Sequence, residues 1–405
     1  MRVVVIGDIG VVDGMIHIGD EAMFDACVAE LARRDIRAIT GISSNTTDTA
    51  QRYGIDSTAR IGFDAVRGGS RAVSVARMNL AVRTARGEAG MLEADDPALA
   101  VIDAVRRSDG VVIAGGGNLS SLWPMHVFER ATLGGIAEAL GKPLVVTGQT
   151  VGPYLDAADT VLVNTLFSSA RRVGLRESAS FELTAEMGVD RARLTLTVDD
   201  ASFLPGAGSA SPDRAVGPPY CLVTLANHIG EADRDSVVAA LAALLDHVAT
   251  TTGLAILFSA HFASTDPNAS RGDSIMHDAI AQHMTAPSSV APTIDARTSA
   301  SLARSAELVV ASRYHPAVFA VAAGVPTIGI PVDDYTTVKL TGALGNLGQS
   351  SVLPVIELLA GHGATLVNTV WADRESIRVS GMRLSHLRRT ASTQWWDAVA
   401  AEFTR

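Results

Sequence analysis

Cysteine is scarce in this 405-residue chain, which holds only Cys27 and Cys221. Two cysteines cannot form a disulfide scaffold or a four-cysteine zinc site, and their scarcity is typical of a reducing compartment. Lysine is also scarce, because only Lys142 and Lys339 occur although lysines and arginines together number 33. Because lysine is so rare here, each of the two is a better candidate for a specific role than a lysine in an average chain.

Positive charge is in deficit as well. The 43 acidic residues exceed the 33 basic ones, so the formal net charge is −10 at pH 7. This argues against a nucleic-acid-binding protein, because such proteins carry a basic face. The 47% hydrophobic and 19% charged residues are typical of a folded chain. At about 100–200 residues per domain, the length predicts two to three domains.

Long hydrophobic runs are absent. The longest uncharged apolar run, residues 316–332, is interrupted by Gly324, Pro326 and Pro331. It predicts a buried helix, turn and strand rather than a membrane span. The apolar stretch before Gly7 is too short for a secretory signal. We therefore expect a soluble cytoplasmic protein, and we leave open a peripheral contact with the inner face of the membrane and a homo-oligomeric state.

A short apolar strand, a loop with glycine or polar residues, and a helix recur along the chain. The predicted strands are 3–6, 110–114, 144–147, 222–225, 254–259, 308–311 and 327–330. Continuous apolar runs of this length, separated by helical stretches, predict parallel sheets that are buried on both faces. The functional site is expected at the carboxyl ends of these strands.

A stretch rich in proline and glycine, 205–219, interrupts this pattern and predicts a linker. It separates a first Rossmann-like domain, 1–204, which we expect to bind the acceptor, from a second, 220–377, which we expect to bind the donor. The remaining segment, 378–405, predicts a helix that we expect to pack back on the first domain. Two doubly wound α/β domains facing a cleft resemble the glycosyltransferase-B (GT-B) architecture.

The segment 60–90 of the first domain is less regular than its surroundings. It carries arginines at positions 60, 67, 71, 77, 83 and 86 among small and apolar residues. These charges form either a solvated helix face or a surface for an anionic lipid or the acceptor.

The most informative motif is Ser312-Arg313-Tyr314-His315, which directly follows the predicted strand 308–311. Pro316 suits the first position of a helix, 316–323, which would end at Gly324. Backbone N–H groups and the helix dipole attract anions at such a junction. His315 is thus a candidate general acid or base, and the alternative is a structural histidine at the helix end.

Two further side chains follow the next predicted strand, 327–330. Tyr335 and Lys339 should reach the same edge of the sheet. Lys339 could bind a phosphate or carboxylate, and the alternative is a surface lysine.

In the first domain, Gly115-Gly116-Gly117-Asn118 follows a buried strand, and Gln149 lies in the next such loop. Glycines there allow a ligand to approach the backbone, and Asn118 can form hydrogen bonds to it. Arg176 ends another short apolar stretch and either grips a substrate carboxylate or pairs with a structural one. Asp20 either caps the first helix or contacts the ligand.

Metal-binding and nucleophile motifs are missing. No two histidines show the spacing of a helical zinc pair beside an acidic partner, and no GxSxG elbow occurs. We therefore expect neither a metal nor a resident cofactor.

Taken in order, the fragments of this sequence resemble the polysaccharide pyruvyl transferase family. The resemblance implies a GT-B-like fold and the transfer of pyruvate from phosphoenolpyruvate to a glycan or lipid-linked sugar as a ketal. It also implies that His315 and Arg176 match the family's important histidine and arginine. The matching fragments are Gly19-Asp20-Glu21-Ala22, Gly115 to Leu119, Gly148 to Pro153, Leu175-Arg176-Glu177 with Ser180, Asp199 to Phe203, Ser312 to His315, Gly324-Val325-Pro326 and Lys339.

Two other functions stay open, a nucleotide-sugar glycosyltransferase of the same fold and a non-catalytic sugar- or nucleotide-binding protein. Retaining enzymes of that fold commonly hold the donor ribose with a glutamate, but residues 315–326 contain no Asp or Glu. A cationic lining around Arg176 and Arg313, free of carboxylates, would suit phosphoenolpyruvate better. The sequence departs from the family at Pro316, in the spacing of Tyr335 and Lys339, and at the segment 60–90, which resembles an insertion. These departures bear on the acceptor more than on the donor.

Overall fold

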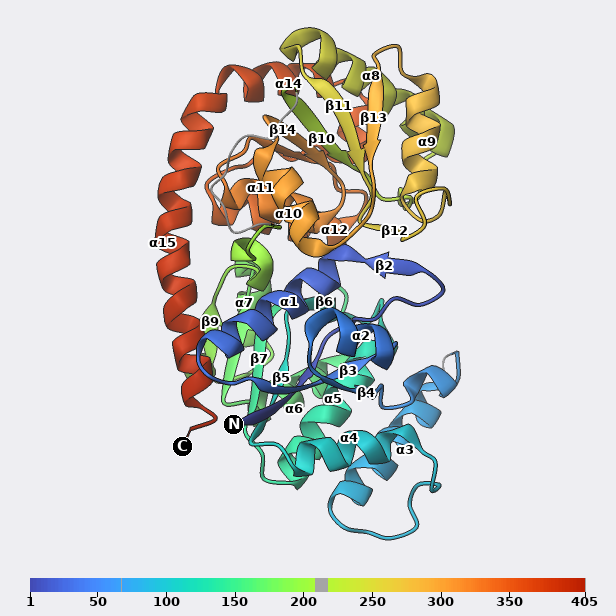
Figure 1. Cartoon of the computed structure of the whole chain (residues 1–405), viewed down its shortest axis with the longest axis vertical. Helices are drawn as coiled ribbons and strands as arrows, with labels where there is room; N and C mark the ends of the chain where they lie inside the picture. Colours follow the sequence, from blue (N-terminus) through green and yellow to red (C-terminus); the bar gives the residue numbers. More distant parts are fainter. Residues whose placement is uncertain (67, 208–217, 405) are drawn as a thin grey trace. The chain divides into compact units, whose positions relative to one another are not determined.

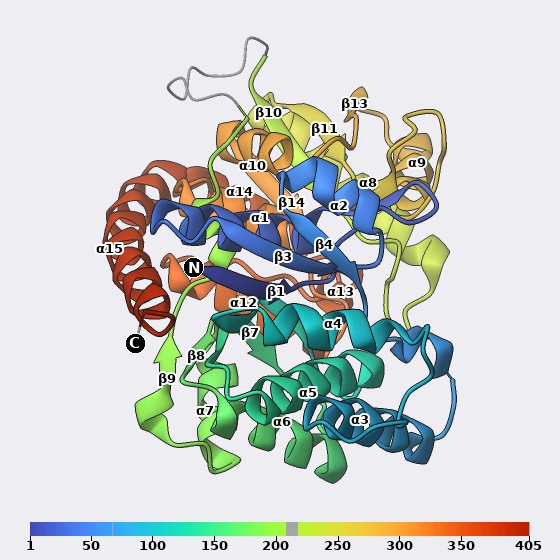
Figure 2. The same cartoon turned by 60° about the horizontal axis from the view of Figure 1, so that its bottom comes forward.

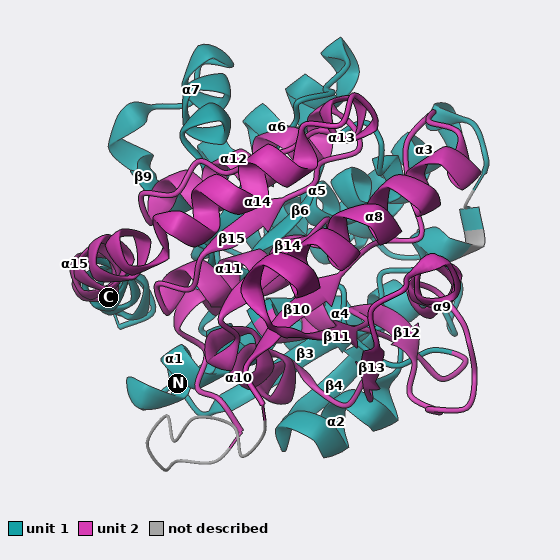
Figure 3. Cartoon of the chain, turned by 90° about the horizontal axis from the view of Figure 1, so that it is seen from above, with its two compact units in different colours: residues 1–12, 23–200, 391–405 teal, residues 13–22, 201–390 magenta. Residues whose placement is uncertain are grey.

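The computed structural model describes residues 1–66, 68–207 and 218–404, and the chain divides into two compact units (Figure 3). Unit 1 comprises Met1–Val12, Met23–Asp200 and Ala391–Arg405, and unit 2 comprises Asp13–Ala22 and Ala201–Thr390. Each unit has its own parallel sheet and core. The predicted α/β class with two Rossmann-like domains is confirmed.

The domain boundaries differ from the expected ones in one respect. Asp13–Ala22, which we expected within 1–204, groups with unit 2. The reason is a small antiparallel pair between β2 (Met15–His17) and β12 (Phe262–Ser264), both labelled in Figure 1. Most of the predicted linker 205–219 lies at 208–217, outside the described residues.

Unit 1 is built on an eight-stranded sheet with the order β4-β3-β1-β5-β7-β8-β9 and with β6 beside β7. Figure 2 labels β4, β3, β1, β7, β8 and β9 of this sheet. All of its pairs are parallel. The direction of the strand order reverses between β1 and β5, because β3 and β4 extend to one side and β7 to β9 to the other. The strands are β1 (Arg2–Ile6), β3 (Ala38–Ser43), β4 (Asp56–Ala59), β5 (Gly110–Ile113), β6 (Gly116–Leu119), β7 (Leu144–Val151), β8 (Arg172–Leu175) and β9 (Leu194–Leu196).

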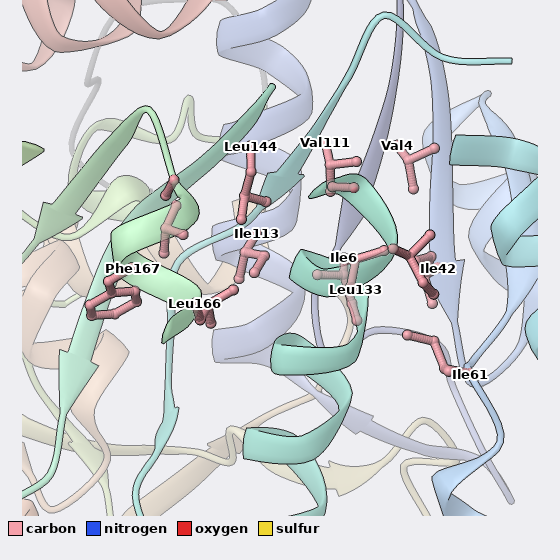
Figure 4. Close-up of a cluster of buried hydrophobic side chains, with 14 of the residues drawn as sticks. Val4, Ile6, Ile42, Ile61, Val111, Ile113, Leu133, Leu144, Leu166 and Phe167 are labelled. Atoms are coloured by element: carbon pink, nitrogen blue, oxygen red, sulfur yellow. The ribbon is translucent and has the colours of Figure 1, made fainter. Parts of the chain in front are cut away.

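Both faces of this sheet are buried, as its continuous apolar strands predict. Val4 and Ile6 of β1 point into the cluster drawn in Figure 4, whereas Val3 and Val5 point to a second cluster with Phe24. Alternating side chains of one strand thus reach opposite helix layers. The helices of unit 1 are α1 (Ile18–Arg33, shared with unit 2), α2 (Thr46–Tyr53), α3 (Arg71–Ala85), α4 (Pro97–Arg106), α5 (Pro124–Ala139), α6 (Ala157–Ser169) and α7 (Ser178–Glu186), with short 3-10 turns at Phe63–Val66, Arg191–Arg193 and Asp200–Phe203.

Unit 2 contains a five-stranded parallel sheet with the order β13-β11-β10-β14-β15. Its strands are β10 (Tyr220–Thr224), β11 (Ala255–Ser259), β13 (Ser288–Ala291), β14 (Leu308–Ala311) and β15 (Thr327–Gly329). Its helices are α8 (Arg234–Thr252), α9 (Ser274–His283), α10 (Ala296–Ser305), α11 (Tyr314–Ala322), α12 (Asp334–Asn346), α13 (Val355–Leu359) and α14 (Gly363–Ala372).

Helix α11 begins two residues before the predicted start at Pro316, so our placement of His315 outside the helix is wrong. Pro316 is tolerated there because N–H groups in the first turn of a helix have no intrahelical acceptor. The predicted end is correct, since Gly324 follows the helix with φ of +74°.

The last helix, α15 (Arg374–Ala401), carries the chain from unit 2 to unit 1. Its Trp395 and Trp396 belong to the core cluster around Phe24. A Cβ atom on Gly174 would lie 2.7 Å from the ring of Trp395, so only glycine leaves room for this indole. No helix among the residues that the structure describes is both long and apolar enough to cross a membrane.

Candidate functional site

His315 lies in the first turn of α11 within unit 2, and its side chain is 6% exposed. Its imidazole packs edge-on against Tyr314, with ring centroids 5.1 Å apart, and near Phe319. A Cβ atom on Gly19, at the start of α1, would lie only 2.1 Å from His315 Nδ1. Gly19 and His315, far apart in the sequence, therefore lie in contact, and any side chain at position 19 would displace the ring.

Arg313 precedes this helix and donates two hydrogen bonds to the buried carboxylate of Asp273. Asp273 also accepts the backbone N–H groups of His261 and Phe262, at 3.2 and 2.9 Å. The expected carboxylate-free lining is therefore wrong at Arg313, because a largely buried guanidinium retains a charged partner that also fixes its direction.

Lys339 lies on α12 between two aromatic rings. Its Nζ donates to Tyr335 Oη at 3.2 Å and lies 4.9 Å and 4.6 Å from the ring centroids of Tyr314 and Tyr335. Among the described residues, this ammonium pairs with no carboxylate. Ring faces compensate a cation only in part, so Lys339 retains the capacity to bind an anionic group.

Ser312 has a structural contact. Its Oγ accepts the backbone N–H of Ala226 at 2.7 Å and so ties the end of β14 to the end of β10. The serine fixes the loop from which Arg313 and His315 project.

His261 was missed from the sequence, although it follows β11 at the carboxyl edge. It is 2% exposed, and neither ring nitrogen has a hydrogen-bond partner among the described residues. Burial, together with the charges of His315, Arg313 and His17, holds the pKa of His261 well below its ordinary value. A neutral imidazole therefore lies beside the candidate acid–base group.

Asp20 does not cap a helix as one reading proposed, because α1 begins at Ile18, two residues earlier. Its carboxylate lies 2.9 Å from His17 Nδ1, on the strand β2. The backbone N–H of Ile18 donates to the carbonyl of His261, so the segment that carries Asp20 is fixed against the end of β11.

Arg176 lies in unit 1 and is fully buried. Its Nη1 donates to Asp199 at 2.6 Å, and its Nε donates to Thr150 and Glu177 at 2.8 and 3.1 Å. These contacts agree with one of the two alternatives from the sequence, in which Arg176 pairs with structural carboxylates. Removing one member of such a buried network destabilises the fold strongly, so the catalytic role of Arg176 stays a prediction whose test needs a measurement of folding.

The glycine-rich segment in unit 1 differs from the expected loop, since Gly116, Gly117 and Asn118 lie in the short strand β6. A Cβ atom on Gly115 or Gly148 would lie 2.8 Å from the carboxyl group of Asp200. These glycines thus make room for a protein side chain rather than for a ligand.

Gln149 is likewise occupied within the protein. Its amide donates to the backbone carbonyls of Ala114 and Thr147, at 2.6 and 3.2 Å. These two bonds hold the ends of β5 and β7 together, so Gln149 has a structural role, and its contact with a ligand stays a prediction.

Asp200 itself is buried and accepts hydrogen bonds from Thr147 Oγ1 and the N–H of Gly115. Its Oδ1 has no partner among the described residues. Burial raises the pKa of Asp200 to about 7, with Asp199 adding to the shift and the Thr147 bond opposing it. The carboxyl group is therefore half protonated near neutral pH.

We expect Asp200→Asn to gain stability over the wild type as the pH rises. The folded chain, with a pKa of about 7 at Asp200, binds this proton more tightly than the unfolded chain, whose pKa is about 3.9. The contribution of Asp200 to the free energy of unfolding therefore falls between pH 4 and 7, by up to about 1.4 kcal/mol per pH unit. Denaturant unfolding at pH 5 and 8 should give the variant a gain in stability, relative to the wild type, of about 2.6 kcal/mol. Asp35→Asn, at an exposed position, should show no such change; equal pH profiles for all three proteins would contradict the assignment.

A second cluster lies in unit 1, where Asp8, His126 and Glu129 bring three metal-ligand atoms within 4.8 Å of one another. The expectation of no metal set was based on spacing along the chain and missed this group. Arg60 and Arg130 lie against it, however, and balance the two carboxylates.

The same arginines affect the acidity of Asp8. Burial alone would raise the pKa of Asp8, but the charges of Arg130, His126 and Arg60 outweigh it and hold the pKa well below its ordinary value. A divalent ion would have to enter beside two guanidinium groups, so the charge pattern opposes a metal there.

The basic segment 60–90 has most of its charge compensated. Arg60 pairs with Asp8 and Glu129, and Arg71, Arg77 and Arg83 pair with acidic side chains of unit 1. Arg67 lies outside the described residues. These pairs remove much of the charge on which a lipid-binding surface would depend.

A family model described as polysaccharide pyruvyl transferase matches residues 17–334. Among solved structures, the calicheamicin glycosyltransferase CalG4 is similar with a TM-score of 0.55 at 18% identity, over 100% of this chain and 98% of that one. Anabaena HepE in complex with UDP and glucose gives 0.58 at 11%, over 99% of both chains. A UDP-GlcNAc 2-epimerase from Methanocaldococcus jannaschii gives 0.57 at 10%, over 91% of this chain and 93% of that one. Such low identities show a shared two-domain fold alone.

Proposed function

The chain belongs to the polysaccharide pyruvyl transferase family, and from this premise we propose that it transfers pyruvate from phosphoenolpyruvate to two hydroxyls of one sugar in a glycan or lipid-linked glycan. The products are a cyclic ketal and phosphate. The observation that supports this most is the convergence of His315, Gly19, Arg313 and Lys339 within unit 2.

The reaction begins with a proton donated to the methylene carbon of phosphoenolpyruvate, which makes the neighbouring carbon electrophilic. We assign this proton transfer to His315, the histidine at the helix start. One sugar hydroxyl adds to that carbon and loses its proton, the C–O bond to phosphate breaks, and a second hydroxyl closes the ketal. Each proton that a hydroxyl loses can return to the imidazole or leave with phosphate.

Lys339 and Arg313 are proposed to hold the two anionic groups of the donor. Lys339 is the better candidate for the phosphate, because the contacts of its ammonium in the described part of the chain are with two tyrosine rings and a phenol oxygen and include no carboxylate. Arg313 is held by Asp273 and keeps 24% of its side chain exposed, which suits the smaller carboxylate. We propose that neither step needs a divalent metal, since a histidine and fixed cations supply the required chemistry.

The direct test is phosphate release from phosphoenolpyruvate, with EDTA present, across a panel of glycan and glycolipid acceptors. Release with one acceptor class supports the proposal. If EDTA abolishes activity and Mn²⁺ restores it, the metal-free part is wrong. If UDP- or GDP-sugars stabilise the protein and phosphoenolpyruvate does not, the nucleotide-sugar glycosyltransferase alternative takes its place.

Lys339→Met is expected to weaken the binding of phosphoenolpyruvate. At about 100 times its Kd the donor should stabilise the wild type by about 2.7 kcal/mol, seen as a rise in Tm. The variant should lose most of this rise because its uncompensated cation is gone. Lys142→Met is a matched control, since the only other lysine donates to the carbonyl of Ser108 in unit 1. Equal donor-induced rises in both variants would exclude Lys339 from the donor site.

A further inference from the structure

A cavity of about 290 Å³ lies in unit 1, at the amino ends of three neighbouring parallel strands. Among its lining residues, Leu144 is the first residue of β7, and Arg171 and Arg193 directly precede β8 and β9. The ends of α5 and α6, which pack side by side (Figure 2), contribute the other walls. The reaction proposed above uses the opposite, carboxyl ends of strands in unit 2, so a ligand of this cavity would serve a separate purpose.

Cationic side chains dominate the lining of this cavity. Lys142, Arg171 and Arg193 face a single lining carboxylate, that of Glu138. Among the residues that the structure describes, none of these three cations forms an ion pair with a carboxylate. Three cations and one carboxylate leave two positive charges on the lining, in a chain whose formal net charge is −10. The cavity therefore attracts anions.

Neighbouring arginines of the same segments are paired. Arg172 lies 2.8 Å from the carboxylate of Glu402, and Arg191 lies 2.6 Å from that of Glu182. Carboxylates are thus available in this region, but they do not neutralise the arginines that line the cavity.

Stabilisation of helix ends explains only part of this positive charge. Cations stabilise the carboxyl ends of helices, and α5 and α6 both end at the cavity. Lys142 Nζ donates to the carbonyl of Ser108 at 2.5 Å, and Arg193 Nη1 donates to that of Ala170 at 2.6 Å. Arg193 keeps its other N–H groups, and the exposed side chain of Arg171 donates no hydrogen bond to any described residue. The two guanidinium groups can therefore hold an anion, whereas Lys142 is used within the protein.

The size and lining of the cavity indicate the class of anion. At about 30 Å³ for each heavy atom, the share of one water in the liquid, the cavity holds about ten heavy atoms. That is larger than inorganic phosphate and matches a three-carbon phosphate ester. Guanidinium groups bind phosphate oxygens in pairs, and Pro143 and Leu144 offer an apolar surface to carbon atoms. The lining residues include no aromatic ring on which a nucleotide base could stack.

We infer that Arg171 and Arg193 bind the phosphate group of a small phosphate monoester in this cavity. Its alcohol part is short and uncharged, since the remaining space is small and is lined by Pro143, Leu144 and glycines. The inference does not depend on the proposed function, because binding at the amino ends of the unit 1 strands can be measured without any transfer.

The direct test is isothermal titration calorimetry with glycerol 3-phosphate at constant ionic strength, because salt screens exposed charges. The wild type should bind this ester. Arg171→Gln and Arg193→Gln should each raise its Kd at least about 10-fold, as the loss of a charged hydrogen bond does. Arg191→Gln is the matched control and should leave the Kd unchanged, since this arginine is 60% exposed, pairs with Glu182 and does not line the cavity.

If Arg193→Gln fails to fold after losing its bond to Ala170, the exposed Arg171→Gln variant decides alone. A Kd that neither variant alters would exclude the cavity as the site. If inorganic phosphate binds as tightly as the ester, the alcohol part has no place there and that part of the inference is wrong.

Hydrogen exchange then locates the ligand within the chain. Glycerol 3-phosphate should slow amide exchange at residues 140–144 and 168–172 of the wild type, and this protection should be lost in Arg171→Gln. Protection confined to residues 312–316 and 333–340 would mean that the phosphate binds at the proposed donor site of unit 2 instead, and would overturn the inference.

Discussion

His315→Ala is expected to lower kcat for pyruvyl transfer at least about 100-fold, the lower range for loss of a general acid or base. The imidazole lies at the carboxyl end of β14, in the first turn of α11, where its position is set by Tyr314 and Gly19. Burial holds the pKa of the neighbouring His261 well below its ordinary value, so that imidazole is a poor substitute as a proton donor. The measurement is phosphate release at saturating donor and acceptor, with circular dichroism to establish the fold.

His283→Ala is a suitable control, because this histidine is exposed on α9 and its Nδ1 lies within hydrogen-bond distance of the backbone carbonyl of Ala279. It should leave kcat unchanged. Near-native turnover by a folded His315→Ala variant would remove the acid–base role. If the wild type shows no turnover and His315→Ala binds ligands as well as the wild type does, the alternative of a non-catalytic binding protein is favoured instead.

The strands that the sequence predicted well are those buried on both faces. Leu308–Ala311 has the predicted bounds, since every side chain of β14 is buried and the run is wholly apolar. The missed strands include Asp56–Ala59 and Ser288–Ala291, which lie at sheet edges and are largely polar. The pattern of apolar residues in a sequence indicates which side chains are buried, and these two edge strands have few buried side chains.

The candidate site was predictable where its residues are contiguous. Arg313 and His315 follow one strand, so the sequence alone places them at a carboxyl edge. Asp8 and Glu129 could not be paired in this way, because their proximity depends on how β1 and α5 pack.

The glycines of the sequence could be interpreted only in part. Gly115 correctly indicated a close approach to the backbone, but the approaching group is Asp200, 85 residues further along the chain. A glycine in the sequence signals that space is needed without identifying what fills it. Gly19 is the same kind of signal, and here the structure identifies the neighbour as His315.

Gly19→Ala is therefore expected to lower kcat about 10- to 100-fold without contacting any substrate. The new Cβ would lie 2.1 Å from His315 Nδ1, so the imidazole must move from its position. A displacement of about 1 Å can cost a catalytic group about 100-fold. Gly345→Ala is the matched control, since this glycine also lies in a helix and a Cβ there meets nothing within 4 Å. It should retain wild-type kcat.

A double mutant separates displacement of His315 from a general loss of structure. If Gly19→Ala acts through the imidazole, it has nothing left to displace once His315 is alanine. The double variant should then be no slower than His315→Ala alone, a strongly non-additive result. It should also be at least as stable as Gly19→Ala, because the overlap with the ring is relieved. If the fold-losses in kcat of the two single variants multiply in the double variant, Gly19 affects the reaction independently of His315.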